Sequence, residues 1–126
     1  MKRRNFSYAD IMSVHHGVTG SCNLVATKFP DGESVKFVVD CGMFQEEGCE
    51  ELNNSFPFNA ENIDFALVTH NHVDHTGRLP FLVKKGFYKK IYMTETTGKL
   101  INLALEDSCH VLRDTAKRRH QKPLYD

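Results

Sequence analysis

Most features that assign a protein to a class at first sight are missing from this sequence of 126 residues. Its 16 basic and 16 acidic side chains cancel, so contacts with nucleic acid would depend on local patches rather than on net charge. Its apolar runs are too short to cross a bilayer. The basic start, Met1–Asn5, is not followed by the apolar segment of a secretory signal. These absences argue against both a membrane protein and a secreted protein.

Paired cysteines are missing as well. Cys22, Cys41, Cys49 and Cys109 contain no C-x-x-C pair. Four cysteines could form two bridges, but nothing else is typical of a secreted protein, so we expect reduced thiols in a cytoplasmic protein. The sequence also lacks repeats, low-complexity tracts and linker-like segments. It is therefore at most one domain, whose core would bury roughly two-thirds of the surface of the unfolded chain.

What the sequence does contain is a histidine-rich stretch, Ala66–Gly77, which overlaps the apolar run Phe65–Val68. This run is short and is followed by turn chemistry, which predicts a buried strand. In an extended backbone alternate side chains share one face, and a turn would bring the last histidine back towards it. Imidazole and carboxylate groups held close together suit Zn²⁺. The candidate metal ligands are His70, His72, Asp74 and His75.

Surface histidines of a polar loop are the alternative, but four potential ligands within six residues make that the poorer interpretation. One metal ion could hardly use all four, because the neighbouring side chains of Asp74 and His75 diverge. Two ions sharing the loop is the easier geometry, so the sequence favours a binuclear centre.

Strand and helix signals alternate around this stretch, which predicts an α/β layered domain. The Pro30–Gly32 turn predicts a hairpin, Gln45–Asn54 should be partly helical, and Gly86 stands where a glycine ends a helix. A long helix up to about Arg119 should begin at a Thr94 or Thr96 cap. The other expected elements are strands Ile11–His15, Cys22–Phe29, Ser34–Asp40, Phe65–Val68 and Ile91–Met93, and a helix Arg78–Lys85.

The long helix carries an apolar stripe at helical spacing, with polar side chains such as Glu106 and Arg113 opposite it. Clusters such as Lys84-Lys85 and Lys117–Arg119 could meet RNA phosphates, but charge runs are more often solvated faces. The stripe consists of Leu100, Ile101, Ala104, Leu105, Ser108, Val111, Leu112 and Thr115.

The HxHxDH motif formed by the four candidate ligands resembles the metal motif of the metallo-β-lactamase fold hydrolases. The longer string Thr69–Phe87, together with Val18–Cys22 and Phe37–Gln45, is similar to one branch of these enzymes, the β-CASP nucleases. The resemblance covers about residues 13–126. It implies an αββα sandwich of which the chain is roughly the N-terminal half, without the remaining half and the β-CASP domain.

By this resemblance, His70 and His72 serve one zinc ion and Asp74 and His75 the other, and Asp74 also orients the attacking hydroxide. Asp40 ends an apolar strand, where an Asp would otherwise be an ordinary turn residue. Its match to the family position implies that it braces the metal loop through hydrogen bonds.

Two further features have weaker signals. The loop residues Thr19, Gly20 and Ser21 could line the site or bind phosphate through backbone N–H groups, although such a loop alone is usually a tight turn. His15 and His16 are adjacent on an expected strand, so at most one can face the site. The ordinary interpretation, one buried and hydrogen-bonded histidine and one exposed histidine, is favoured.

The resemblance also implies a function, the hydrolysis of RNA by water activated between two zinc ions in the complete enzyme. A third histidine and a bridging aspartate complete the family's site, and no such pair follows His75. We therefore expect weak, partial zinc occupancy, no activity of these residues by themselves, and self-association through an uncovered sheet face that includes Val25, Val38 and Leu67. A thioester hydrolase of the same fold and a non-catalytic interaction module are the alternatives.

Overall fold

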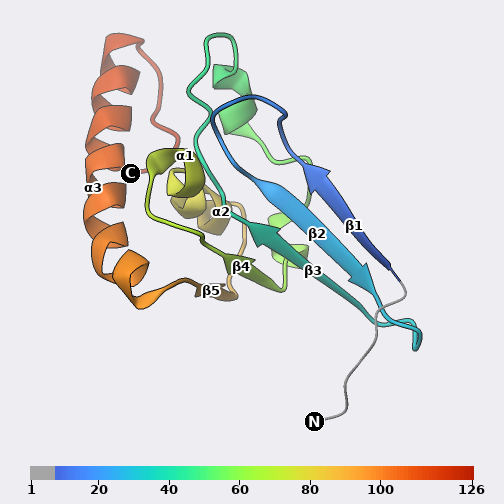
Figure 1. Cartoon of the computed structure of the whole chain (residues 1–126). Helices are drawn as coiled ribbons and strands as arrows, with labels where there is room; N and C mark the ends of the chain where they lie inside the picture. The colour runs from blue at the N-terminus through green and yellow to red at the C-terminus, as the bar shows by residue number, and fades with distance from the viewer. Residues whose placement is uncertain (1–7) are drawn as a thin grey trace.

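The computed structural model describes residues 8–126, so the basic start of the sequence, Met1–Asn5, lies outside the described residues. A five-stranded mixed sheet forms its centre, in the order β1-β2-β3-β4-β5 (Figure 1). The first three strands pair antiparallel, and the last two are added in parallel. The strands are β1 (Tyr8–Ser13), β2 (Asn23–Lys28), β3 (Ser34–Val39), β4 (Phe65–Leu67) and β5 (Lys90–Tyr92).

The helices confirm the expected α/β alternation. Thr94 caps the long helix, because its hydroxyl oxygen accepts a hydrogen bond from the Thr97 N–H at 3.2 Å. Gly86 follows the short helix with φ of 103°, in the left-handed region that commonly ends helices. Within residues 8–126, none of the helices has the length and apolar character needed to cross a membrane. They are η1 (Glu50–Asn54), η2 (Ala60–Asn62), α1 (Val73–Thr76), α2 (Leu79–Lys84) and α3 (Glu95–Arg118).

The first strand differs from the expected Ile11–His15, because it begins at Tyr8 and ends at Ser13. Beyond Ser13 the chain turns, and the Ser13 hydroxyl donates to the His15 carbonyl oxygen at 2.8 Å. The two histidines therefore lie in a loop rather than on a strand. The hairpin predicted at Pro30–Gly32 is confirmed, with β2 and β3 in antiparallel register from Asn23 opposite Val39.

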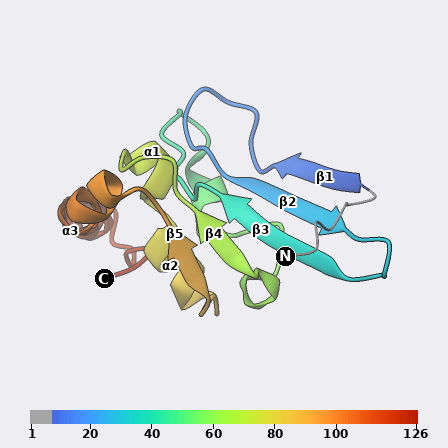
Figure 2. The same cartoon turned by 60° about the horizontal axis from the view of Figure 1, so that its bottom comes forward.

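The hydrophobic core lies on one face of the sheet. Leu24, Val38, Ala66 and Ile91 stand directly opposite one another on neighbouring strands, so they share this face. Val38 and Ala66 are buried in the same cluster as Leu82 of α2. The helices reach this core from the β5 side, where α3 stands beside the sheet with α2 nearer the strands (Figure 2).

The other face of the sheet carries a second apolar row. Val25 stands opposite Phe37 and Phe37 opposite Phe65, and the two phenylalanine rings stack with centroids 4.7 Å apart. Ile11 extends this row at the sheet edge and is 72% exposed. The prediction that Val38 belongs to this face was wrong, because the hairpin register pairs Val25 with Phe37 and turns Val38 to the opposite side.

The long helix buries a narrower line of residues than the predicted stripe. Ile101 and Ser108 are buried as expected. Leu100 and Val111 are 44% and 58% exposed, so their assignment to the buried stripe was wrong. The helix is rotated so that the buried line continues through Ala116, and this leaves both residues at its margin. The expected polar side, including Glu106 and Arg113, is exposed.

Candidate metal centre

The candidate metal ligands and Asp40 meet at one edge of the sheet. Asp40 follows β3, and the HxHxDH motif follows β4. Because β3 and β4 are parallel, their carboxyl ends lie side by side, and residues far apart in the sequence become neighbours there. The Asp40 N–H donates to the Leu67 carbonyl oxygen at 2.8 Å, which fixes the exits of the two strands relative to each other.

The short helix α1 folds the motif back on itself. His72 is in the extended region with ψ of 146°, and the chain enters α1 at the next residue. The Thr76 hydroxyl donates to the His72 carbonyl oxygen at 2.9 Å and stabilises this turn. The ring centroid of His70 consequently lies 4.6 Å from that of His72 and 4.0 Å from that of His75. The turn at α1 therefore brings the three imidazoles together.

Asp74 completes the group. Its carboxylate oxygen lies 3.6 Å from His75 Nε2, so the expectation that these neighbouring side chains diverge was wrong. Both side chains are about a quarter exposed. The four side chains offer three imidazoles and one carboxylate, and His72 is open to solvent. This donor set fits zinc, which binds imidazole and carboxylate ligands and keeps a position open to solvent in catalytic sites.

Asp40 lies almost fully buried behind the motif, at 3% exposure. One carboxylate oxygen accepts from the Thr69 N–H at 2.8 Å, and the other lies 2.7 Å from His75 Nδ1. A carboxylate accepts, so Nδ1 carries the proton and Nε2 keeps the lone pair that a metal ion needs. Asp40 has φ of 61°, in the left-handed region that few residues other than glycine adopt. The backbone conformation aims its carboxylate at the motif.

The segment after Asp40 holds the backbone of the motif. Cys41 N–H donates to the His75 carbonyl oxygen at 2.8 Å, and Ser21 N–H donates to the Asp74 carbonyl oxygen at 2.8 Å. A Cβ atom at Gly42 would lie 1.6 Å from the Asp74 carbonyl oxygen, so a side chain at this position would displace the motif. The backbone of Asp40-Cys41-Gly42 therefore fixes the position of the candidate metal loop.

The loop residues Thr19, Gly20 and Ser21 line a pocket together with Asp74 and His75. Their backbone N–H groups are not all available for a phosphate. The Thr19 N–H donates to Glu46 Oε1 at 2.8 Å, and the Ser21 N–H is used by Asp74. The suggestion of a phosphate-binding loop was therefore wrong for these two groups.

Arg78 is a supporting residue that sequence reasoning treated only as the start of a helix. Its side chain is fully buried between the rings of Phe44 and Phe56, 4.5 Å and 4.8 Å from their centroids. Its Nε donates to the Gly42 carbonyl oxygen at 2.7 Å. Arginine side chains are usually exposed, so the sequence contained no signal that Arg78 is buried.

All four cysteines lie in the described range and are free thiols, and burial raises the pKa of the Cys41 thiol well above its usual value. His16 is exposed, as expected, whereas His15 is half-buried rather than buried. His110 is exposed on α3, away from the motif.

The family-model comparison now defines the class of protein. The model of the metallo-beta-lactamase superfamily matches residues 17–113, so the chain belongs to this superfamily, as its motif suggested. Membership confirms the predicted fold class and implies that the chain binds metal.

The individual proteins that the chain is similar to have more specific names than the superfamily. The chain is 41% identical over 97 residues to "Ribonuclease TTHA0252" of Thermus thermophilus, covering 75% of this chain and 21% of that protein. It is 34% identical over 111 residues to "Transcription termination factor FttA" of Cenarchaeum symbiosum, covering 83% and 16%. It is 28% identical over 107 residues to "Endoribonuclease ysh1" of Aspergillus fumigatus, covering 83% and 12%. The chain thus spans about a fifth or less of the length of these relatives.

Among solved structures, the chain is similar to human tRNase Z, short form, with a TM-score of 0.44 and 17% identity. The similarity covers 94% of this chain and 43% of that one.

Proposed function

We propose that the chain is the N-terminal part of the catalytic domain of a zinc-dependent ribonuclease of the β-CASP branch. The convergence of His70, His72, Asp74 and His75 at one sheet edge carries this proposal. The match to the superfamily model includes this segment, and relatives of the chain include proteins named as ribonucleases. Because the chain spans only a small part of those relatives, the activity is that of a whole protein rather than of these residues alone.

The resemblance to the family divides the ligands between two ions. His70 and His72 would hold one zinc ion, and Asp74 and His75 would hold a second. Two zinc ions, when bound, lower the pKa of a shared water towards roughly 7 and neutralise charge that develops on phosphorus. Asp40 keeps the proton on His75 Nδ1, which leaves Nε2 free as a ligand. By the same resemblance, Asp74 would also orient the attacking water.

The names of the relatives favour RNA as the substrate, and the basic side chains of the chain add only nonspecific support for RNA binding. Lys84 donates to the Leu124 carbonyl oxygen, and Lys85 and Lys89 lie over the rings of Phe81 and Tyr88. These lysines already have local partners, so they do not carry the proposal. The free thiols are consistent with the cytoplasmic location that we propose.

Cleavage of a labelled single-stranded RNA by the full-length protein that contains this chain tests the proposal. We expect His72→Ala and Asp74→Asn to lower kcat by on the order of 100-fold or more, because each removes a metal ligand. His110→Ala, an exposed histidine on α3, is the matched control and should leave the rate unchanged. Undiminished cleavage by His72→Ala would refute the assignment of the motif. Hydrolysis of a thioester without cleavage of RNA would instead support another hydrolase of this fold.

A further inference from the structure

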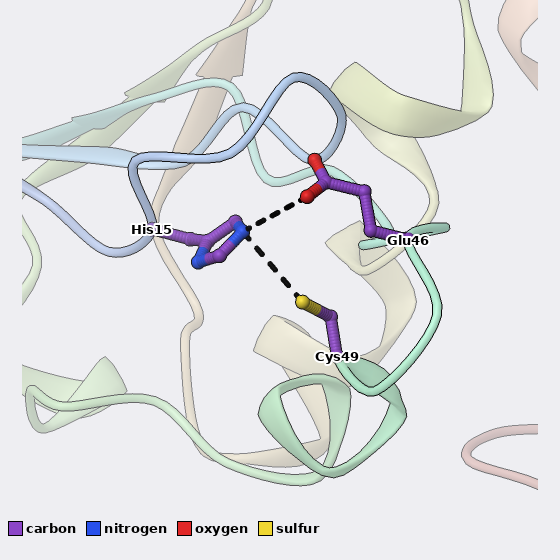
Figure 3. A group of neighbouring side chains, drawn as sticks. All are labelled: His15, Glu46 and Cys49. Carbon is purple, nitrogen blue, oxygen red and sulfur yellow. Dashed lines mark hydrogen bonds and ion pairs between the residues drawn. The ribbon is translucent and has the colours of Figure 1, made fainter.

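A second group of metal-binding side chains lies outside the HxHxDH motif: His15, Glu46 and Cys49 (Figure 3). Among the described residues, this is the group whose donor atoms all lie within 4.8 Å of one another. His15 comes from the loop after β1, and Glu46 and Cys49 come from the segment between β3 and η1. All three are half-buried, so they are shielded from solvent but still accessible to an ion.

In this group the His15–Glu46 distance is longer than a direct hydrogen bond, and the His15–Cys49 distance is that of a hydrogen bond to sulfur. His15 Nε2 lies 3.7 Å from Glu46 Oε2 and 3.7 Å from Cys49 Sγ. A direct N–H···O hydrogen bond would be roughly 2.7–3.2 Å long. Tetrahedral zinc with its usual bond lengths places ligand nitrogen and oxygen about 3.3 Å apart, and nitrogen and sulfur about 3.5 Å apart. The two His15 distances therefore exceed the values for a shared zinc ion by only a few tenths of an ångström, and the donor atoms of Glu46 and Cys49 lie within 4.8 Å of each other.

Neighbouring residues orient the side chains of His15 and Glu46. The His15 ring packs edge-on against Phe44, with centroids 5.1 Å apart. Glu46 Oε1 accepts from the Thr19 N–H, which leaves Oε2 on the His15 side. This hydrogen bond also lowers the pKa of Glu46 below its usual value, so its carboxylate is ionised at neutral pH. Metal ligands are commonly oriented by contacts of this kind.

Gly17 makes room for the group. A Cβ atom at this position would lie 2.1 Å from His15 Nε2 and 2.4 Å from Glu46 Oε1. The backbone of the loop therefore passes directly over the donor atoms, and the absence of a side chain leaves space for them.

We propose that His15 Nε2, a Glu46 carboxylate oxygen and Cys49 Sγ form a single-zinc site, with water as the fourth ligand. Zinc binds imidazole, carboxylate and thiolate ligands together, and on binding it displaces the thiol proton of Cys49 to solvent. The ion would tie the glycine-rich loop to the segment after β3. Since Thr19–Ser21 line the pocket next to Asp74, the zinc would also fix one wall of the candidate metal centre.

Titration of the 126-residue chain with Co²⁺ under reducing conditions separates the two sites, because only the proposed one contains sulfur. We expect thiolate-to-cobalt charge-transfer absorption for the unaltered chain and for His72→Ala. Cys49→Ser should abolish it, whereas Cys109→Ser, the matched half-buried thiol on α3, should retain it. Absence of the absorption in the unaltered chain, its persistence in Cys49→Ser, or its loss in His72→Ala would each overturn the proposal.

A glycine substitution tests the geometry without removing a ligand. Gly17→Ala should weaken Co²⁺ binding at the thiolate site at least about tenfold, because the new methyl group occupies the space of the donor atoms. Gly98→Ala on α3 is the matched control, since a Cβ there would meet only Met93 atoms at 3.9 Å. Equal affinity of Gly17→Ala and the unaltered chain would show that the three side chains do not form the site.

Discussion

The role of Asp40 gives the sharpest test of the metal centre, and Asp40→Asn is the perturbation that isolates it. Asn has nearly the volume of Asp and also tolerates the left-handed backbone at φ of 61°, so the main chain should not move. Its amide oxygen can still accept from the Thr69 N–H. What changes is the atom 2.7 Å from His75 Nδ1, which becomes a donor facing a donor.

The effect of Asp40→Asn on stability and on zinc affinity depends on which nitrogen of His75 carries the proton. If the proton stays on Nδ1, the charge-assisted hydrogen bond is lost and the His75 N–H has no acceptor, which costs about 1.5–3 kcal/mol of unfolding free energy. If the proton moves to Nε2, this cost is avoided, but the lone pair required by zinc is lost. Either way zinc affinity should fall about 10–100-fold, which corresponds to about 1.4–2.7 kcal/mol.

Competition with a chromophoric chelator measures this affinity, in a Cys49→Ser background so that only the motif contributes. Urea unfolding of the metal-free chain separates the two responses of His75. Asp64→Asn is the control, because its carboxylate also accepts a backbone N–H, from Lys36 at 2.8 Å, but lies away from the motif. The reasoning fails if Asp40→Asn binds zinc as tightly as the control does.

Three further predictions concern zinc occupancy of the motif, self-association of the chain and the stability that Tyr125 contributes. In the Cys49→Ser background, zinc occupancy should be partial, because each ion at the proposed centre would have only two protein ligands, and His72→Ala should remove the remainder. We propose that the chain self-associates through the Ile11 face of the sheet, since burial of apolar surface stabilises by about 25 cal/mol per Å². Ile11→Lys should then lower the sedimentation coefficient at micromolar concentration. Tyr125→Phe should cost about 1–2 kcal/mol of unfolding free energy at pH 7, because the Tyr125 hydroxyl donates to the carbonyl oxygen at the C-cap of α1.

Each of these predictions has its own contradicting result. Tight binding of two zinc ions by monomeric Cys49→Ser would contradict the first. For the second, Leu103→Lys is the control, because Leu103 is also exposed, at 69%, but lies on α3. Equal sedimentation of the two lysine variants, or a monomeric unaltered chain, would exclude the Ile11 face.

The Tyr125 prediction also has a pH dependence. Burial raises the pKa of Tyr125 above its usual value, so its contribution to stability is complete below about pH 10. The contribution is lost as the pH rises through the raised folded-state pKa. Tyr125→Phe should therefore flatten the loss of stability at alkaline pH, and an unchanged alkaline profile would contradict this.

The sequence by itself determined the features that depend on near neighbours. The convergence of His70, His72 and His75 follows from their spacing after a buried strand and from the turn that α1 supplies. The Thr94 cap and the Gly86 terminus are likewise local, because each satisfies backbone groups within one helical turn. For the cap and the helix terminus a few consecutive residues contain the physical cause, whereas the histidines also depend on Asp40, 35 positions before His75.

Only the tertiary structure decided which face Val38 occupies and which residues join His15. A shift of the hairpin register by one residue would exchange the two faces of the strand, and the alternating pattern alone does not fix that register when both faces are apolar. Cys49 is 34 positions from His15, and no periodicity relates them. They meet because the sheet places the loop after β1 beside the segment after β3, and long-range pairing of this kind is a property of the whole fold.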